Sequence, residues 1–127
     1  MQTLILVAAG GATGAVMRYL LSEQTLRTVG GAWPYGTLTA NVLGSLLMGC
    51  LAGAVALRGG ADGEKLRLLL GVGVLGGFTT FSAYSLEVVL MIERRAYGQA
   101  AVYSLGSVAL SVAALFVGLI FIRRLFA

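Results

Sequence analysis

Four long apolar segments follow one another along the chain, with only short polar or glycine-containing stretches between them. They cover about residues 4–21, 35–57, 66–92 and 99–122. A helix needs about 20 residues to cross a hydrocarbon core roughly 30 Å thick, and each segment is close to that length or exceeds it. The pattern therefore predicts an all-α membrane protein in which residues 1–127 form a single domain of four transmembrane helices.

The composition also indicates a lipid environment. Of the 127 residues, 58% are hydrophobic and 11% are charged, and the mean hydropathy is +0.92. A soluble domain carries about 25% charged residues, so this chain has too few charges to cover a surface in water. Residues 1–15 end in small side chains, as a signal peptide does, but they contain no Lys or Arg, and the apolar pattern continues to Leu21. We therefore expect this segment to be retained as the first span.

Several classes of function are excluded by the residues that the chain lacks. It has no His and a single cysteine, Cys50, so neither a Ser-His-Asp nor a Cys-His catalytic set is available. No group of residues has the spacing of metal ligands. The net charge is +4, but the basic residues are scattered, which argues against a nucleic-acid partner. We expect no enzymatic activity.

The basic residues are divided almost evenly between the two sides of the membrane, if the four spans alternate. One side has five and the other has three or four, namely Arg58, Lys65, Arg67, Arg123 and Arg124 against Arg27, Arg94, Arg95 and, near the end of the first span, Arg18. Orientation follows the Lys/Arg excess near span ends, and here the excess is small. We predict that the chain inserts both ways and that two antiparallel copies assemble, as inverted repeats do in transporters. The alternative is that the small excess fixes one orientation.

The third span contains the stretch Gly76-Gly77-Phe78-Thr79-Thr80, which is unfavourable inside a helix because a glycine costs about 1 kcal/mol relative to alanine. We predict that this helix is broken at mid-membrane. Freed carbonyls survive in hydrocarbon only when protein or a watery cavity covers them, and two antiparallel copies that cross at their breaks would cover them. Converging carbonyls without carboxylates favour a monovalent cation, Na⁺ or K⁺. An unbroken helix with packing glycines and self-bonded hydroxyls is the alternative.

Hydroxyl and amide side chains recur at helical spacing on the other spans. A spacing of i, i+4, i+8 puts three side chains on one face of a helix. Two such stripes are present: Thr37, Asn41 and Ser45, and Tyr103, Ser107 and Ser111. One stripe alone would be explained by packing between helices. With Ser82 and Ser85 of the third span, the stripes offer many hydrogen-bond donors and no carboxylate.

Positive groups accompany these donors. Arg18 lies within the first span, and the rings of Phe81 and Tyr84 have positive edges because of the aromatic quadrupole. A small anion that holds its water tightly needs such a dense set of donors. The residues therefore indicate an anion pore.

The chain resembles the Fluc (CrcB) family of fluoride channels along essentially its whole length. The matching pieces are Gly11–Ala15 with Arg18, Trp33–Asn41 with Gly44, Gly76–Ser82 with Ser85 and Glu87, and then Glu93-Arg94 and Tyr97-Gly98. The resemblance implies a dual-topology homodimer in the bacterial inner membrane, whose two antiparallel pores passively export fluoride from the cytoplasm.

The resemblance also implies the roles of individual residues. Backbone carbonyls of Gly76 and Thr79 would hold a structural Na⁺ at the dimer interface. Arg18 matches a basic residue near the vestibule, and Glu87 matches a carboxylate beside the pore. The pore residues would be Asn41, Phe81, Ser82, Tyr84, Ser85, Tyr103, Ser107 and Ser111. The family usually has Phe where this chain has Tyr84, so the anion meets either a ring edge or a hydroxyl there.

Two other functions remain as alternatives. A small multidrug transporter-like exporter also has four helices, but its proton coupling needs a carboxylate in the first span, and Glu23 stands only at the end of that span. A membrane subunit without transport of its own is the second alternative.

Overall fold

The computed structural model describes residues 1–31 and 33–126, and all regular structure in that part of the chain is helical. The elements are α1 (Gln2–Val29), α2 (Tyr35–Arg58), α3 (Gly60–Leu66), the π-helical stretch η1 (Arg67–Leu75), α4 (Gly76–Phe78), α5 (Phe81–Glu93) and α6 (Tyr97–Phe126). Four helical stretches are long and apolar enough to cross a membrane: Gln2–Val29, Tyr35–Arg58, Gly60–Glu93 and Tyr97–Phe126. The predicted all-α class and the four membrane-length helices are confirmed.

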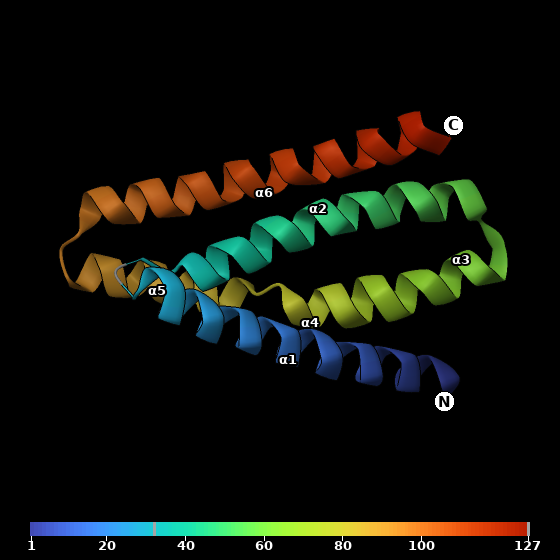
Figure 1. Cartoon of the computed structure of the whole chain (residues 1–127), viewed down its shortest axis with the longest axis horizontal. Helices are drawn as coiled ribbons and strands as arrows, with labels where there is room; N and C mark the ends of the chain where they lie inside the picture. The colour runs from blue at the N-terminus through green and yellow to red at the C-terminus, as the bar shows by residue number, and fades with distance from the viewer. Residues whose placement is uncertain (32, 127) are drawn as a thin grey trace.

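The helices run up and down as a bundle (Figure 1). Both chain termini and the connection from α2 to α3 lie at one end, and the connections from α1 to α2 and from α5 to α6 lie at the other. Helices α3, η1 and α4 form a continuous rod; α2 packs mainly along α6, and α1 packs along the η1 and α4 part of this rod. Arg58 and the pair Arg123 and Arg124 therefore share one end of the bundle, as the alternation of spans predicted.

Glycines bring the backbones of neighbouring helices into contact. A Cβ atom added to Gly118 of α6 would lie 2.9 Å from the backbone nitrogen of Cys50 in α2. One added to Gly10 of α1 would lie 2.6 Å from the carbonyl oxygen of Leu69 in η1. Small residues at helix crossings are typical of membrane proteins, where association depends on close packing and not on expelling water.

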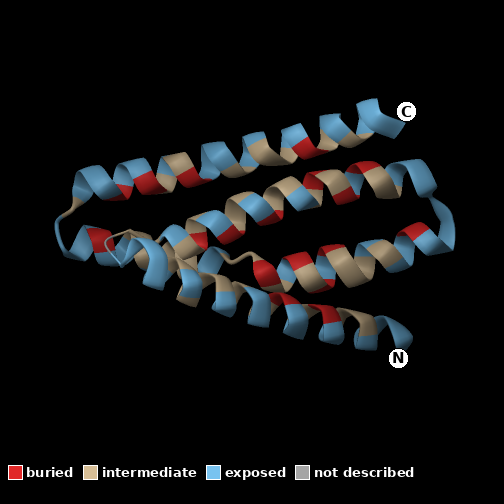
Figure 2. Cartoon of the chain, in the orientation of Figure 1, coloured by how far each residue is buried: buried red, intermediate tan, exposed pale blue. Residues whose placement is uncertain are grey.

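The outer surface of the bundle is apolar. Figure 2 shows the buried residues where helices face one another and exposed residues around the outside. The exposed positions include large hydrophobic side chains such as Leu4, Val102, Leu105 and Phe116. Exposed side chains of this kind on several helices suit contact with lipid, as the composition predicted.

The third membrane-length stretch is interrupted between α4 and α5. Thr79 (φ −86°, ψ 156°) and Thr80 (φ −151°, ψ 125°) are extended, and helix resumes at Phe81. Gly76 and Gly77 remain helical, so the interruption falls on the two threonines and not on the glycine pair. β-Branched residues favour extended backbone. The Thr80 hydroxyl also accepts a 3.1 Å hydrogen bond from the N–H of Ala83 and so caps the start of α5.

Candidate functional site

The side chain of Asn41 in α2 binds the interrupted backbone from both sides. Its Oδ1 accepts a 2.8 Å hydrogen bond from the N–H of Thr80, and its Nδ2 donates a 3.0 Å hydrogen bond to the carbonyl of Thr80. The Thr79 hydroxyl donates to the carbonyl of Leu75 at 2.9 Å. An amide nitrogen has two N–H groups, so Asn41 keeps one donor for another acceptor.

A cavity of about 370 Å³ lies beside the interruption, between α2, α5 and α6, and is called the central cavity below. Its wall includes Asn41, Thr79, Phe81, Tyr84, Ser107 and Ser111. Five of the eight predicted pore residues therefore meet at one place. The Ser107 Oγ is buried and makes no hydrogen bond within residues 1–31 and 33–126. A buried polar atom normally has a partner, so this hydroxyl is free to donate to a ligand.

Three aromatic rings form a row, and two of them, Phe81 and Tyr84, line the central cavity. The centroids of Phe81 and Tyr84 are 5.4 Å apart, and those of Tyr84 and Tyr103 are 5.5 Å apart. The Tyr84 hydroxyl donates a 2.8 Å hydrogen bond to the backbone carbonyl of Ser104 in α6. Its proton is thus engaged by the protein, while the ring of Tyr84 forms part of the cavity wall.

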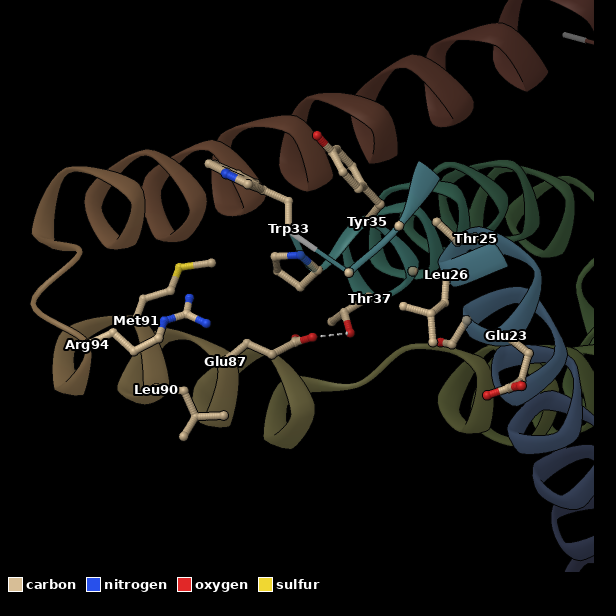
Figure 3. Close-up of a pocket in the computed structure, with 15 residues that line it drawn as sticks. Glu23, Thr25, Leu26, Trp33, Tyr35, Thr37, Glu87, Leu90, Met91 and Arg94 are labelled. Atoms are coloured by element: carbon tan, nitrogen blue, oxygen red, sulfur yellow. Dashed lines mark hydrogen bonds between the residues drawn. The ribbon is translucent and has the colours of Figure 1, made fainter. Parts of the chain in front are cut away.

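A second cavity, of about 330 Å³, opens near the connection between α1 and α2 and is called the end cavity (Figure 3). Glu87 of α5 lines it, and both carboxylate oxygens accept hydrogen bonds. The Thr37 hydroxyl donates to Oε2 at 3.0 Å, and the Tyr103 hydroxyl donates to Oε1 at 3.1 Å. Donors from α2 and α6 therefore hold this carboxylate beside the central cavity and not inside it.

Tyr103 connects the two cavities. It is only 1% exposed, and its ring packs against Tyr84 while its hydroxyl reaches Glu87 in the end cavity. Trp33 packs edge-on against the same ring, with centroids 5.9 Å apart at 83°. Tyr103 was predicted as a pore residue, and the structure places it between the two cavities.

Ser82 and Ser85 are not brought to either cavity in the part of the chain that the structure describes. Ser82 is exposed, and its hydroxyl lies 3.2 Å from that of Thr80. Ser82 lies on a different side of α5 from Phe81 and Tyr84, because residues one or two apart do not share a helical face, whereas Ser85 stands four residues after Phe81 and so lies near its face. Their assignment to the pore stays a prediction.

Arg18, which was predicted near the vestibule, and Gly76 and Thr79, which were predicted to hold the cation, are gathered around the end of α4. The Arg18 Nε donates a 3.3 Å hydrogen bond to the carbonyl of Gly77, and Arg18 lines neither cavity among the described residues. The carbonyl oxygens of Gly76 and Thr79 accept no hydrogen bond within residues 1–31 and 33–126. Free backbone carbonyls are hard oxygen ligands of the kind that a small cation binds. These two residues therefore fit the predicted cation.

Acidic, His and Cys ligands offer no second candidate for a metal centre. No group of three such residues that could hold a metal ion occurs within residues 1–31 and 33–126.

Sequence reasoning missed three partners of the predicted residues. Thr37 binds Glu87, and its place in one stripe with Asn41 was the available signal. The backbone of Thr80 binds Asn41, and the carbonyl of Ser104 binds Tyr84. A backbone group leaves no signal in a side-chain pattern, so these two contacts appear only in the fold.

The chain matches known proteins over nearly its full length. The family model of the CrcB-like protein, Camphor Resistance (CrcB), matches residues 5–119. A protein of Phenylobacterium zucineum named fluoride-specific ion channel FluC is 72% identical over 127 residues, covering 100% of both chains. Proteins of the same name from Caulobacter vibrioides (59% identical, 100% of both chains) and Agrobacterium fabrum (49% identical, 99% of this chain and 100% of that one) also match. This chain is therefore a multi-pass membrane protein that belongs to the CrcB family.

Proposed function

We propose that this protein is a fluoride-specific ion channel that lets fluoride leave the cytoplasm passively. The observation that carries the proposal is the 72% identity, over the whole of both chains, to a protein named as such a channel. The central cavity supports it, because among its apolar side chains the polar groups are one amide and several hydroxyls, with two aromatic rings and no carboxylate, and such groups suit an anion. A cavity lined by carboxylates would instead favour a cation.

The residues of the central cavity replace the water around the ion. The second N–H of Asn41 and the hydroxyls of Ser107 and Ser111 donate hydrogen bonds, and the positive ring edges of Phe81 and Tyr84 face an anion favourably. Each donor lost from a desolvated site costs about 1–3 kcal/mol. Several donors acting together therefore offset much of the cost of removing water from fluoride.

Efflux from liposomes tests the function. Purified protein is reconstituted into vesicles loaded with potassium fluoride or potassium chloride, and release is followed with ion-selective electrodes after valinomycin is added. We expect rapid fluoride release and little chloride release without any other gradient. A multidrug exporter would need a proton gradient and an organic substrate, and a subunit without transport would release neither ion.

We infer further that the working unit is an antiparallel, dual-topology homodimer with two pores. The small Lys/Arg excess supports insertion in both directions. Phe81 is 77% exposed in the single chain, directly after the interruption, and Gly76, three residues before Thr79, is also exposed. Extended backbone in hydrocarbon requires cover, and a second copy that crosses at mid-membrane provides it.

Cysteine labelling tests the topology. Ala61 is an exposed residue of α3 at the end of the bundle that holds both termini, whereas Gly59 and Gly60 have positive φ and are poor places for a side chain. In a Cys50→Ser background, Ala61→Cys should react partly with a membrane-impermeant maleimide outside intact cells and fully after lysis. The Cys50→Ser protein alone should stay unlabelled. Labelling that is complete, or absent, before lysis contradicts dual topology.

We propose that a structural Na⁺ lies where the two interruptions meet. The carbonyls of Gly76 and Thr79 are free in one chain, so two copies supply four oxygen ligands. The cation neutralises the partial negative charge of these carbonyls in a place without water. Its role is to join the two copies, and the conducted ion passes through the central cavities.

Exchange of the cation should weaken the dimer. We expect prolonged dialysis against N-methylglucamine to shift the protein from dimer to monomer in detergent and to lower its fluoride flux, because four converging carbonyls then repel one another. Addition of Na⁺ should restore both properties. Dimer stability and flux that are indifferent to every alkali cation would exclude the site.

The hydroxyl of Tyr84 should be dispensable for conduction. Since it donates to the carbonyl of Ser104 and not toward the cavity, Tyr84→Phe keeps the ring edge and loses only a tie between α5 and α6. Single hydrogen bonds between membrane helices average about 0.6 kcal/mol. We expect fluoride flux within about threefold of wild type, the factor to which that energy corresponds. A much larger loss in the liposome assay would mean that the hydroxyl itself binds the anion.

A further inference from the structure

Arg18 belongs to the face of α1 that packs on the interrupted rod. Gly10, Gly14 and Arg18 follow one another at four-residue spacing and so lie on one side of the helix. Both glycines are buried, and a Cβ atom on Gly14 would lie 2.8 Å from the backbone nitrogen of Phe78 in α4. The next position on this face, Arg18, is therefore beside the end of α4.

The carbonyl of Gly77 has lost its ordinary helical partner. In a continuous helix it would accept from the N–H of Phe81, four residues later, but Thr79 and Thr80 are extended and displace Phe81. The N–H of Thr80 is also diverted, to Asn41. The Arg18 Nε fills the empty place at 3.3 Å in a partly buried contact.

We propose that Arg18 is a positioning residue of the interruption, which it holds open by capping the carbonyl of Gly77. Without this cap, α4 would either join α5 in one continuous helix with its backbone hydrogen bonds restored, or unwind at its end. Either change moves the carbonyls of Gly76 and Thr79. The inference rests on the proposed cation site and channel function. It assigns Arg18 to the backbone, because Arg18 lines neither cavity in the part of the chain that the structure describes.

Three substitutions separate the donor from the charge. In Arg18→Gln, the Nε2 stands the same number of bonds from Cα as the Nε of arginine, so the donor stays and the charge goes. In Arg18→Lys, a methylene takes that place, so the charge stays and the donor moves. Arg18→Met has neither. Arg27→Gln is the matched control, because Arg27 is an exposed residue of the same helix in its last turn, away from the interruption.

Amide hydrogen exchange at Thr79 and Thr80 reads the interruption directly, since their N–H groups donate to Leu75 and Asn41. In nanodiscs, exchange should become at least about tenfold faster in Arg18→Lys and Arg18→Met, the change expected when a hydrogen bond from a charged donor is lost. The exchange rates of Arg18→Gln and Arg27→Gln should stay within about threefold of wild type, because local opening depends on the contacts that remain and both variants keep the donor to Gly77.

Three results would overturn the proposal: protection kept by Arg18→Lys and lost by Arg18→Gln, exchange in Arg18→Gln as fast as in Arg18→Met, or no change in any variant. A failure of Arg18→Gln to fold counts against it too, whereas failure of only Arg18→Lys and Arg18→Met supports it. Fluoride efflux is measured on the same samples. Wild-type protein without efflux would refute the channel function, while the order of exchange rates would still decide the role of Arg18.

Discussion

Asn41→Asp should reduce fluoride flux more than Asn41→Ala does, although aspartate is the closer match in shape. Alanine removes both hydrogen bonds to Thr80 and leaves its N–H and carbonyl without partners. One such loss costs about 1–3 kcal/mol, so flux should fall roughly tenfold to a hundredfold. Aspartate still accepts from the Thr80 N–H, but it turns a donor into an anion that faces the Thr80 carbonyl and the central cavity.

The added charge decides the order of the two variants. Two like charges 4 Å apart repel by about 4 kcal/mol at an effective dielectric constant near 20, which exceeds the energy of the one hydrogen bond that aspartate keeps. Flux is measured by efflux from liposomes, with Met48→Leu as a control that lines the same cavity and conserves volume. Equal flux from wild type and both variants would remove Asn41 from the pathway. A lower flux in Asn41→Ala than in Asn41→Asp would show that support of the Thr80 backbone matters more than the added charge.

Asn41 also illustrates how far the sequence could be interpreted. Its four-residue spacing from Thr37 placed both side chains on one face of a helix, and both do bind the α5 region. That they bind there through Glu87 and through the backbone of Thr80 could not be predicted, because those partners lie 50 and 39 residues away in the chain. Hydropathy shows where membrane-length helices are, and only the packing of those helices shows which faces meet.

The interruption lies within the predicted stretch Gly76–Thr80, on its two threonines and not on its glycine pair. Glycine has low helix propensity, and this preference pointed to Gly76 and Gly77. Both glycines instead stay helical, and Gly77 lies so close to Gly11 that an added Cβ would be 3.1 Å from the Gly11 Cα atom. Helix packing thus overrides propensity at this pair. The extended conformation moves to Thr79 and Thr80, where Asn41 can satisfy the exposed backbone.

Phe81→Ile should abolish most fluoride flux while leaving the fold intact. Asn41 binds both the N–H and the carbonyl of Thr80, and Phe81 follows directly as the first residue of α5. The position of Phe81 is therefore fixed. Its ring lines the central cavity and is tilted 44° from that of Tyr84. A ring without a hydroxyl offers an anion only its positive edge. Isoleucine keeps much of the apolar volume and has no quadrupole, so we expect at least about a tenfold loss, in line with one missing favourable contact in a desolvated site.

The exposure of Phe81 makes this loss separable from unfolding. Because the ring is 77% exposed in the single chain, its replacement removes little packing within that chain. The helical circular dichroism of Phe81→Ile should therefore match that of wild type, as should that of Leu105→Ile, a control at an exposed apolar residue of α6 that lines neither cavity among the described residues. Leu105→Ile should also keep its fluoride efflux. If Phe81→Ile releases fluoride from liposomes as fast as this control, the ring only packs between helices and contributes nothing to conduction.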